Sequence, residues 1–368
     1  MKVLLVGVGA AGNKAVVSAV ESGTVDIQDT MIINSTTKDF PSNYEGKKIV
    51  LSDGDTGCGK ERSIADEYAK AAMNSGKFTF TDIDMDQYAS VAIVTSVEGG
   101  TGSGASPIIA KLFKKVYNKN VHIIAFIGFE DDTRGLANTV EFFKDVDPSL
   151  IVQTISNKSF MNEAGGNKSR AEELANREMA KKISVITGQD FIAGEQNIDD
   201  TDILKLANTS GYLTVEKKTF NKSLETPEDF NKIVKNMIYN SSSIKIDNPS
   251  GARIGVVLNI SPASEDAIDY SFDQLKEAYG DPYELFTQKQ WDGKKEYIAY
   301  IVSGMKMPID ELQAIYQRYK DRTSAMDKNG DAFFNAMQEM SILDEDRKFD
   351  MIKNQSEGMS IADFLKEN

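Results

Sequence analysis

Two residue types on which many active sites and secreted proteins depend are almost absent from this sequence. Its 368 residues contain one cysteine, Cys58, so no disulfide can form within the chain, and a reducing cytoplasm is the expected location. The one histidine, His122, lies in the apolar stretch 120–129 and is interpreted as a buried strand residue. A histidine-based triad or a multi-histidine metal site is therefore not expected, and any chemistry must come from carboxylates, backbone amides or a cofactor.

Long apolar runs and an excess of positive charge are also missing. No run reaches the roughly 18 residues that a transmembrane helix needs, so membrane insertion is not expected. The opening MKVLLVGVG has too short an apolar stretch for a signal peptide and is interpreted as a first buried strand. With 56 acidic against 42 basic residues the net charge is −14, which argues against direct binding to DNA phosphates.

Apolar strand-like segments alternate with helical segments through the first half of the chain. This alternation predicts an α/β fold with a Rossmann-like parallel sheet covered by helices on both faces. Ligands of such sheets bind at the carboxyl ends of the strands. The expected strands lie at 2–6, 30–35, 47–52, 89–97, 120–129 and 149–155, and the expected helices at 13–23, 65–77 and 105–118.

The second half has a different pattern. One long helix is expected over 169–186, followed by a smaller α+β unit whose strands, 252–261 and 294–304, flank a helix at 264–280. From Pro308 onward the chain reads as an amphipathic helix. Its apolar face is formed by Ile309, Leu312, Ile315, Tyr316 and Tyr319.

Three glycine-rich loops precede helical segments in the first half. GVGAAG at 7–12 fits the G-x-G-x-x-G fingerprint of dinucleotide-binding enzymes, but Asn34 stands where a dehydrogenase needs an acid, and Asp39 lies further on. GDTGCGK at 54–60 nearly matches a P-loop, but Glu61 replaces the hydroxyl that binds magnesium. EGGTGSG at 98–104 brings four glycines together with the hydroxyls of Thr101 and Ser103. The interpretation that gives all three loops a role is that together they bind a triphosphate.

These motifs resemble those of a known family. GGTGSG at 99–104 resembles the signature loop shared by tubulin and FtsZ, and GVGAAGNKAV at 7–16 and TGCG at 56–59 are similar to the first and the γ-phosphate loops of FtsZ. Residues 194–202 fit G-x-x-N-x-D-x-x-D, the catalytic loop of that family. The chain is thereby identified as a member of the tubulin/FtsZ superfamily, most similar to TubZ, the plasmid and phage tubulins.

The resemblance implies a domain organisation and a ligand. Residues 1–168 would be a GTP-binding domain, 169–202 the central helix and catalytic loop, 203–307 the C-terminal α+β domain, and 308–368 a C-terminal helix and tail. The ligands would be GTP or GDP with Mg²⁺. The nucleotide-binding residues that it implies are Gly9, Ala10, Ala11, Asn13, Gly57, Cys58, Gly59, Gly99, Gly100, Thr101, Gly102, Ser103, Glu130, Arg134, Asn157 and Asn176.

The base and ribose contacts come from the same resemblance. Glu130 and Arg134 would contact the ribose side, and Asn157 would read guanine. Asn176 has the spacing of the tubulin asparagine that reads the base, although Arg177 stands where FtsZ has an aspartate. An ordinary solvated face is the alternative for Glu130, Arg134 and Asn176.

The family's catalytic loop completes the pocket of the next subunit in a head-to-tail filament. Asp199 and Asp202 would orient and polarise the attacking water, and a helix N-cap is an alternative role that is compatible with catalysis. The partners implied are other copies of the chain and a DNA-binding adaptor on a centromere-like site, so that plasmid or phage DNA is segregated without direct DNA binding. The end of the chain, with Ile361, Phe364 and Leu365 at helical spacing, could dock this adaptor or pack on its own domain.

Four other interpretations stay open on the sequence alone. An FtsZ-type cell-division GTPase and a phage-spindle tubulin would use the same chemistry for other purposes. A Rossmann oxidoreductase would bind NAD, and a P-loop NTPase would depend on Lys60.

Overall fold

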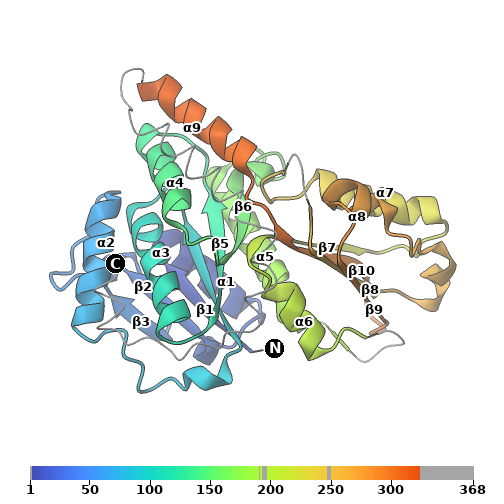
Figure 1. Ribbon diagram of the computed structural model, residues 1–368, viewed down its shortest axis with the longest axis horizontal. Helices are drawn as coiled ribbons and strands as arrows, with labels where there is room; N and C mark the ends of the chain where they lie inside the picture. Colours follow the sequence, from blue (N-terminus) through green and yellow to red (C-terminus); the bar gives the residue numbers. More distant parts are fainter. Residues whose placement is uncertain (1, 190, 193–196, 247–249, 324–368) are drawn as a thin grey trace.

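The computed structural model describes residues 2–189, 191–192, 197–246 and 250–323, and it organises them around one ten-stranded sheet (Figure 1). The strand order is β3-β2-β1-β4-β5-β6-β7-β10-β8-β9. All neighbours from β3 to β7 in this order are parallel, which confirms the expected parallel sheet. The strands of the first half are β1 (Val3–Val8), β2 (Thr30–Asn34), β3 (Lys47–Val50), β4 (Ser90–Ser96), β5 (Asn120–Ile127) and β6 (Ile151–Ser156).

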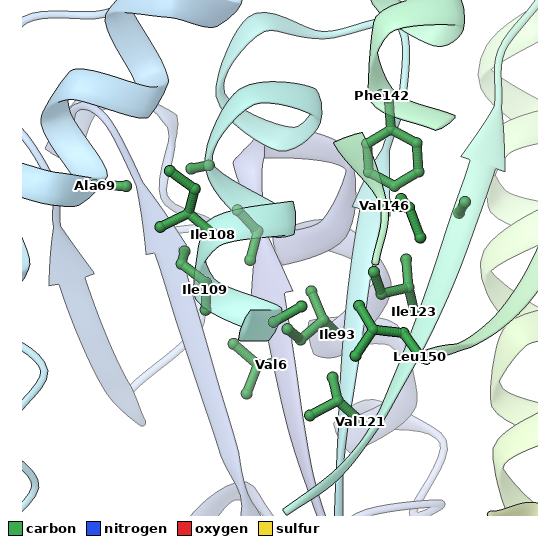
Figure 2. Packing of buried hydrophobic residues seen from close by; sticks show 14 of the residues in the cluster. Val6, Ala69, Ile93, Ile108, Ile109, Val121, Ile123, Phe142, Val146 and Leu150 are labelled. Atoms are coloured by element: carbon green, nitrogen blue, oxygen red, sulfur yellow. The ribbon is translucent and has the colours of Figure 1, made fainter. Parts of the chain in front are cut away.

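Helices cover both faces of this parallel part. On one face, α1 (Gly9–Glu21) and the central helix α5 (Lys168–Ile186) share a buried cluster with the sheet through residues such as Val16, Met179 and Leu5. On the other face lie α2 (Arg62–Asn74), α3 (Gly100–Lys115), α4 (Thr133–Asp145) and α9 (Ile309–Thr323). Figure 2 shows part of this second cluster, in which Phe142 of α4 lies above Ile123 of β5.

The second half continues the same sheet. β7 (Gly211–Phe220) pairs in parallel with β6 through two residue pairs and in antiparallel fashion with β10 (Glu296–Met305). β8 (Arg253–Asn259) and β9 (Glu284–Gln290) complete it. The helices of this half are α6 (Asp200–Ala207), α7 (Pro227–Tyr239) and α8 (Asp273–Tyr279).

Several elements differ from the expectations. β7, β9, α4 and α7 were not anticipated, and α6 was anticipated only through the helix N-cap alternative for Asp199 and Asp202. The helix expected over 264–280 is divided into a 3-10 helix at Pro262–Ala267 and α8. Phe272 between them has a φ of +50°, a left-handed conformation that interrupts an α-helix. The amphipathic helix expected after Pro308 is confirmed as α9, with Leu312, Ile315 and Tyr316 buried.

No helix in the described part of the chain is long and apolar enough to cross a membrane. The predicted docking residues Ile361, Phe364 and Leu365 lie outside the described residues, as do residues 194–196 of the catalytic-loop motif.

His122 is buried near the start of β5, as expected. Its Nε2 lies 3.2 Å from Oδ1 of Asn208, the residue that ends α6. Burial lowers the pKa of His122 to about 4, and the hydrogen bond with Asn208 opposes this shift only in part. The ring is therefore neutral in the folded chain over a pH range in which an unfolded histidine is protonated.

This difference predicts a pH-dependent loss of stability. Because the folded pKa lies below the unfolded value, the stabilisation is present above pH 6.5 and is lost as the pH falls towards 4. Urea unfolding of the wild type and of His122→Gln at pH 7 and pH 5 should differ in their pH dependence by about 2 kcal/mol. An equal loss in both proteins would contradict the prediction, because all other titrating groups are common to them.

Candidate functional site

The first glycine loop forms the start of α1, directly after the buried strand β1. Val8 is the N-cap residue, and no side chain of the described residues caps this helix. Gly9 has a φ of +78°, a conformation that glycine adopts without a steric penalty, and Ala10 and Ala11 are exposed. An uncapped helix N-terminus offers N–H groups and the positive end of the helix dipole to an anion.

The third glycine loop forms the start of α3. This helix begins at Gly100 inside the glycine run, so the run is the first helical turn and not the loop that the sequence indicated. Gly99 is the N-cap residue and, within the described chain, the helix has no side-chain cap. A β-carbon placed on Gly99 would meet no heavy atom within 4 Å, so the space in front of this helix end is open.

Close backbone contacts bring the three loops together. A β-carbon on Gly9 would lie 2.9 Å from the amide nitrogen of Gly102, and one on Gly100 would lie 2.9 Å from Sγ of Cys58. Thr101 adds a side-chain link, because its Oγ1 lies 3.0 Å from Sγ of Cys58 and 2.9 Å from Oγ of Ser35. The structure thus gathers the expected phosphate-binding residues 9–11, 57–59 and 99–103 at the carboxyl ends of β1, β3 and β4, and we call this set the phosphate cradle.

Three asparagines at the same edge have polar atoms that fit a ligand. Within the described residues, both polar side-chain atoms of Asn13, Nδ2 of Asn34 and Oδ1 of Asn157 are buried without a hydrogen-bond partner. An unpaired buried amide group costs about 1–3 kcal/mol, which a ligand with donors and acceptors can offset. Asn157 follows β6 directly, so its free Oδ1 can accept an N–H group of a base at the far side of the cradle.

Two exposed ion pairs hold the second glycine loop against α4. Nζ of Lys60 lies 2.7 Å from Asp132, and Nη2 of Arg134 lies 2.5 Å from Glu61. The hydrogen bonds from Lys60 and from the Gly135 amide lower the pKa of Asp132. Arg134, expected near the ribose, is thus engaged with the residue that departs from the P-loop pattern.

Glu98 is a site residue that the sequence analysis did not single out. Its Oε1 accepts the backbone N–H of Glu130 at 2.9 Å, and its side chain fills the space beside Gly128 and Gly135, where a β-carbon would clash with it or crowd it. Burial raises the pKa of Glu98, and so do the nearby charges of Glu130, Asp132 and Asp131, while the Glu130 amide lowers it. In the sequence, the only indication of this role was that Glu98 is the first residue of EGGTGSG.

Glu130 lies at the cradle edge but is not free. It is buried, has a φ of +57°, and its carboxylate pairs with Lys158 at 2.8 Å and with Arg318 at 2.5 Å. The expected ribose contact would have to be made from within this ion-pair cluster. Asn176 is half-buried on α5, one residue after Ala175, which packs in the core shared with α1.

Asp199 and Asp202 lie near the amino ends of the parallel strands, opposite the carboxyl ends where the phosphate cradle lies. They form a capping box at the start of α6, in which Oδ1 of Asp199 accepts the Asp202 N–H at 2.9 Å. α6 ends at Asn208 against His122 near the start of β5, and Gln189, after α5, contacts the turn that follows α1. Figure 1 shows α6 at the end of the sheet where β1 begins, whereas α4 and α9 lie towards the other end.

Two cavities lie away from the phosphate cradle. One of about 430 Å³ is lined by parts of α7, α8 and β7, and one of about 330 Å³ lies between α2 and α3. Neither contains an expected nucleotide-binding residue, so the candidate site rests on the loop geometry and not on the cavity volumes.

Comparisons with known proteins agree with this geometry. The sequence profile described as "Tubulin/FtsZ family, GTPase domain" matches residues 2–164. The tubulin-like protein CetZ3 of Haloferax volcanii is 24% identical over 58% of this chain, and the match spans 59% of CetZ3, less than two thirds of its length. The tubulin-like protein TubZ of Clostridium botulinum C phage is 23% identical over 96% of both chains.

The fold is shared with solved structures of these proteins. The GTPγS-bound protofilament of CetZ2 from Haloferax volcanii superposes with a TM-score of 0.72 at 15% identity, covering 88% of this chain and all of that one. The tubulin-like fold expected from the sequence is confirmed. Residues 2–164 match the GTPase-domain profile of the Tubulin/FtsZ family, and the similarity in fold extends over 88% of the chain.

Proposed function

We propose that this chain binds GTP in the phosphate cradle, hydrolyses it between adjacent subunits of a head-to-tail filament, and thereby moves plasmid or phage DNA. The observation that carries the proposal is the placement of two uncapped helix N-termini at one edge of the sheet and of two aspartates at the other. One subunit then supplies the phosphate-binding half of a site, and its neighbour supplies the half that acts on water.

The cradle divides the triphosphate among its loops. The N–H groups of residues 9–11 bind the α- and β-phosphates, those of 99–103 bind the β- and γ-phosphates, and residues 57–59 approach the γ-phosphate. The base lies towards β6, where Asn157 reads guanine and Asn176 of α5 closes the far side. This arrangement uses the unpaired polar atoms of Asn13 and Asn157.

Magnesium is compatible with this site as an ion that the phosphates of the nucleotide would coordinate. Among the described residues, no three histidine, cysteine, aspartate or glutamate side chains converge on one point. Mg²⁺ commonly keeps several waters and binds through phosphates and one or two carboxylates, so a protein cage is not required. Bound there, it would neutralise the charge that develops on the transferred phosphoryl group.

Hydrolysis at a subunit contact follows from the charges. Asp199 and Asp202 are acceptors for a water proton, and both stay close to the α6 N-terminus through their capping box. Within one subunit two carboxylates beside a triphosphate would repel it, so assembly delivers them only when a neighbour binds. A contact between opposite edges of two copies is heterologous and continues into a fibre, the form in which CetZ2 was solved as a protofilament.

DNA segregation through an adaptor is the proposed use of the filament. The net charge of −14 disfavours a direct grip on DNA phosphates, and the phage protein TubZ aligns with nearly the whole chain. A cell-division role is the second candidate, because the matched family includes FtsZ.

The open space at Gly99 provides a test of phosphate binding. Gly99→Val should fold, because its φ of −79° and ψ of 159° suit any residue and its β-carbon would meet no atom within 4 Å. We expect its Kd for a fluorescent GTP analogue to rise at least about tenfold, since the side chain enters the proposed phosphate position. Gly54→Val, on an exposed glycine with similarly open surroundings, is the control. Equal binding by both variants would contradict the cradle.

Asp202→Asn tests hydrolysis at the subunit contact. The amide keeps an oxygen that can cap α6 but lacks the carboxylate, so kcat for GTP should fall by a factor of about 100. Asp229→Asn alters the matching capping box of α7 and should leave turnover unchanged. Wild-type turnover per subunit should also appear only above a threshold protein concentration. The mechanism would be contradicted if total turnover rose linearly with protein concentration, without a threshold, and if Asp202→Asn left kcat unchanged.

Retention of a replicon tests the cellular role. A plasmid that carries the intact gene and its flanking DNA should be kept by more cells after growth without selection than the same plasmid with the Asp202→Asn codon change. If both plasmids were retained equally well and only the variant disturbed cell division, the result would favour the cell-division role instead.

A further inference from the structure

The buried carboxylate of Glu130 joins three elements that are distant in the sequence. Its side chain is 7% exposed, and its left-handed backbone conformation is uncommon for a residue with a β-carbon. Such a conformation persists where the surrounding contacts hold it, and it is frequent at functional sites. The contacts of Glu130 lead to α9, to the loop before α3 and to the residue after Asn157.

The first set of contacts comes from α9. Nη2 of Arg318 donates to Oε1 of Glu130 at 3.3 Å, and its Nε lies 2.5 Å from Oε2 as an ion pair. Nη1 of Arg322, one turn later, donates to the Glu130 carbonyl at 2.9 Å. One helix thus binds both the side chain and the backbone of a single residue. Charge-assisted hydrogen bonds to a buried carboxylate are stronger than bonds between neutral groups.

The second set leads to the phosphate cradle. The N–H group of Glu130 donates to Oε1 of Glu98, which immediately precedes the N-cap residue Gly99 of α3. Asn138 of α4 donates to the carbonyl oxygens of both Glu98 and Lys60, at 3.0 and 3.1 Å, so two of the three cradle loops are tied to the same place. A shift of Glu130 therefore changes the position of the start of α3.

The third set leads to the base end of the site. Nζ of Lys158 lies 2.8 Å from Oε1 of Glu130, and Lys158 follows Asn157 in the same 3-10 helix. Glu130 thus contacts both the phosphate side and the base side of the proposed pocket, and α9 holds it from outside.

We propose that Arg318 and Arg322 of α9 are positioning residues for the nucleotide site, which they act on through Glu130 and Glu98. The inference rests on the nucleotide site proposed above, and it assigns the C-terminal helix a role beyond packing. Docking of α9 fixes Glu130, Glu130 fixes Glu98 and Lys158, and the cradle then binds nucleotide with less reorganisation. By linkage, bound nucleotide must strengthen the docking of α9 by the same factor.

The apolar face of α9 makes the test possible. Leu312, Ile315 and Tyr316 are buried in the core shared with α3 and α4, so the helix stays docked when one arginine is changed. Arg318→Gln then removes the charge that faces Glu130 and leaves this packing in place. Gln317→Ala, on the preceding residue of the same helix, removes a hydrogen bond to Asp321 and is the matched control.

The experiment measures the Kd of a fluorescent GDP analogue at protein concentrations below filament formation. Arg318→Gln should raise the Kd about tenfold, Arg318→Lys should restore part of the affinity, and Gln317→Ala should stay within about twofold of the wild type. In a Glu98→Ala background, Arg318→Gln should change the Kd by less than about threefold, because the link to the cradle is already broken. Unchanged binding by Arg318→Gln, or equal effects in both backgrounds, would overturn the inference.

Hydrogen exchange on the unmodified protein provides a second readout. Amides of α9 should exchange more slowly with GDP bound than without it, and equal exchange would count against the linkage even if a variant failed to fold. A wild type that binds no guanine nucleotide would remove the proposed function itself. A wild type that binds GDP while Arg318→Gln binds it equally well removes only the role of α9.

Discussion

The contact between the first turns of α1 and α3 is the constraint on which the candidate site depends. A β-carbon on Gly12 would lie 2.1 Å from the carbonyl oxygen of Val94, and one on Gly9 would lie 2.9 Å from the amide nitrogen of Gly102. Only glycine allows α1 to lie this close to β4 and to α3. Because neither helix start has a side-chain cap among the described residues, two positive dipole ends face the same space. An anion between them would offset their repulsion, and the triphosphate proposed above carries that charge.

The parallel strand order separates the two parts of the proposed reaction. The carboxyl ends of β1 and β4 carry the cradle, whereas α6 returns the chain to the amino ends of the strands, where Asn208 meets His122. A buried lysine supports this arrangement at the junction of the two halves. Lys182 of α5 is 1% exposed and lies 2.9 Å from Oε1 of Glu216 on β7, beside the short β6–β7 pairing. Burial raises the pKa of Glu216, and the charge of Lys182 opposes the rise. Removing Lys182 would leave the buried Glu216 without its cation, so this pair holds α5 against β7.

The proposed role of α9 adds a third region to this picture. Its apolar face was predictable, because Leu312, Ile315 and Tyr316 recur at helical spacing, and the structure buries all three. Its polar face carried no comparable signal. Arg318 and Arg322 both contact Glu130, a residue that lies 188 positions before Arg318 in the chain. Buried charges therefore connect the candidate site to the C-terminal helix through Glu130, and the central helix to β7 through Lys182.

The sequence by itself determined the parallel sheet, the positions of its first six strands along the chain, the three glycine loops and the resemblance to the tubulin/FtsZ family. These features are local: strand periodicity, glycine runs before helices and motif spacing depend on neighbours in the chain. It did not determine that α3 starts inside the glycine run, that β7 extends the same sheet, or that Glu98 and Glu130 meet. Glu98 is one acid among many in the sequence, and Glu130 was expected at the ribose and not between Lys158 and Arg318. Only the tertiary structure decided these points, because a buried charge takes its role from partners that the fold brings to it from distant segments.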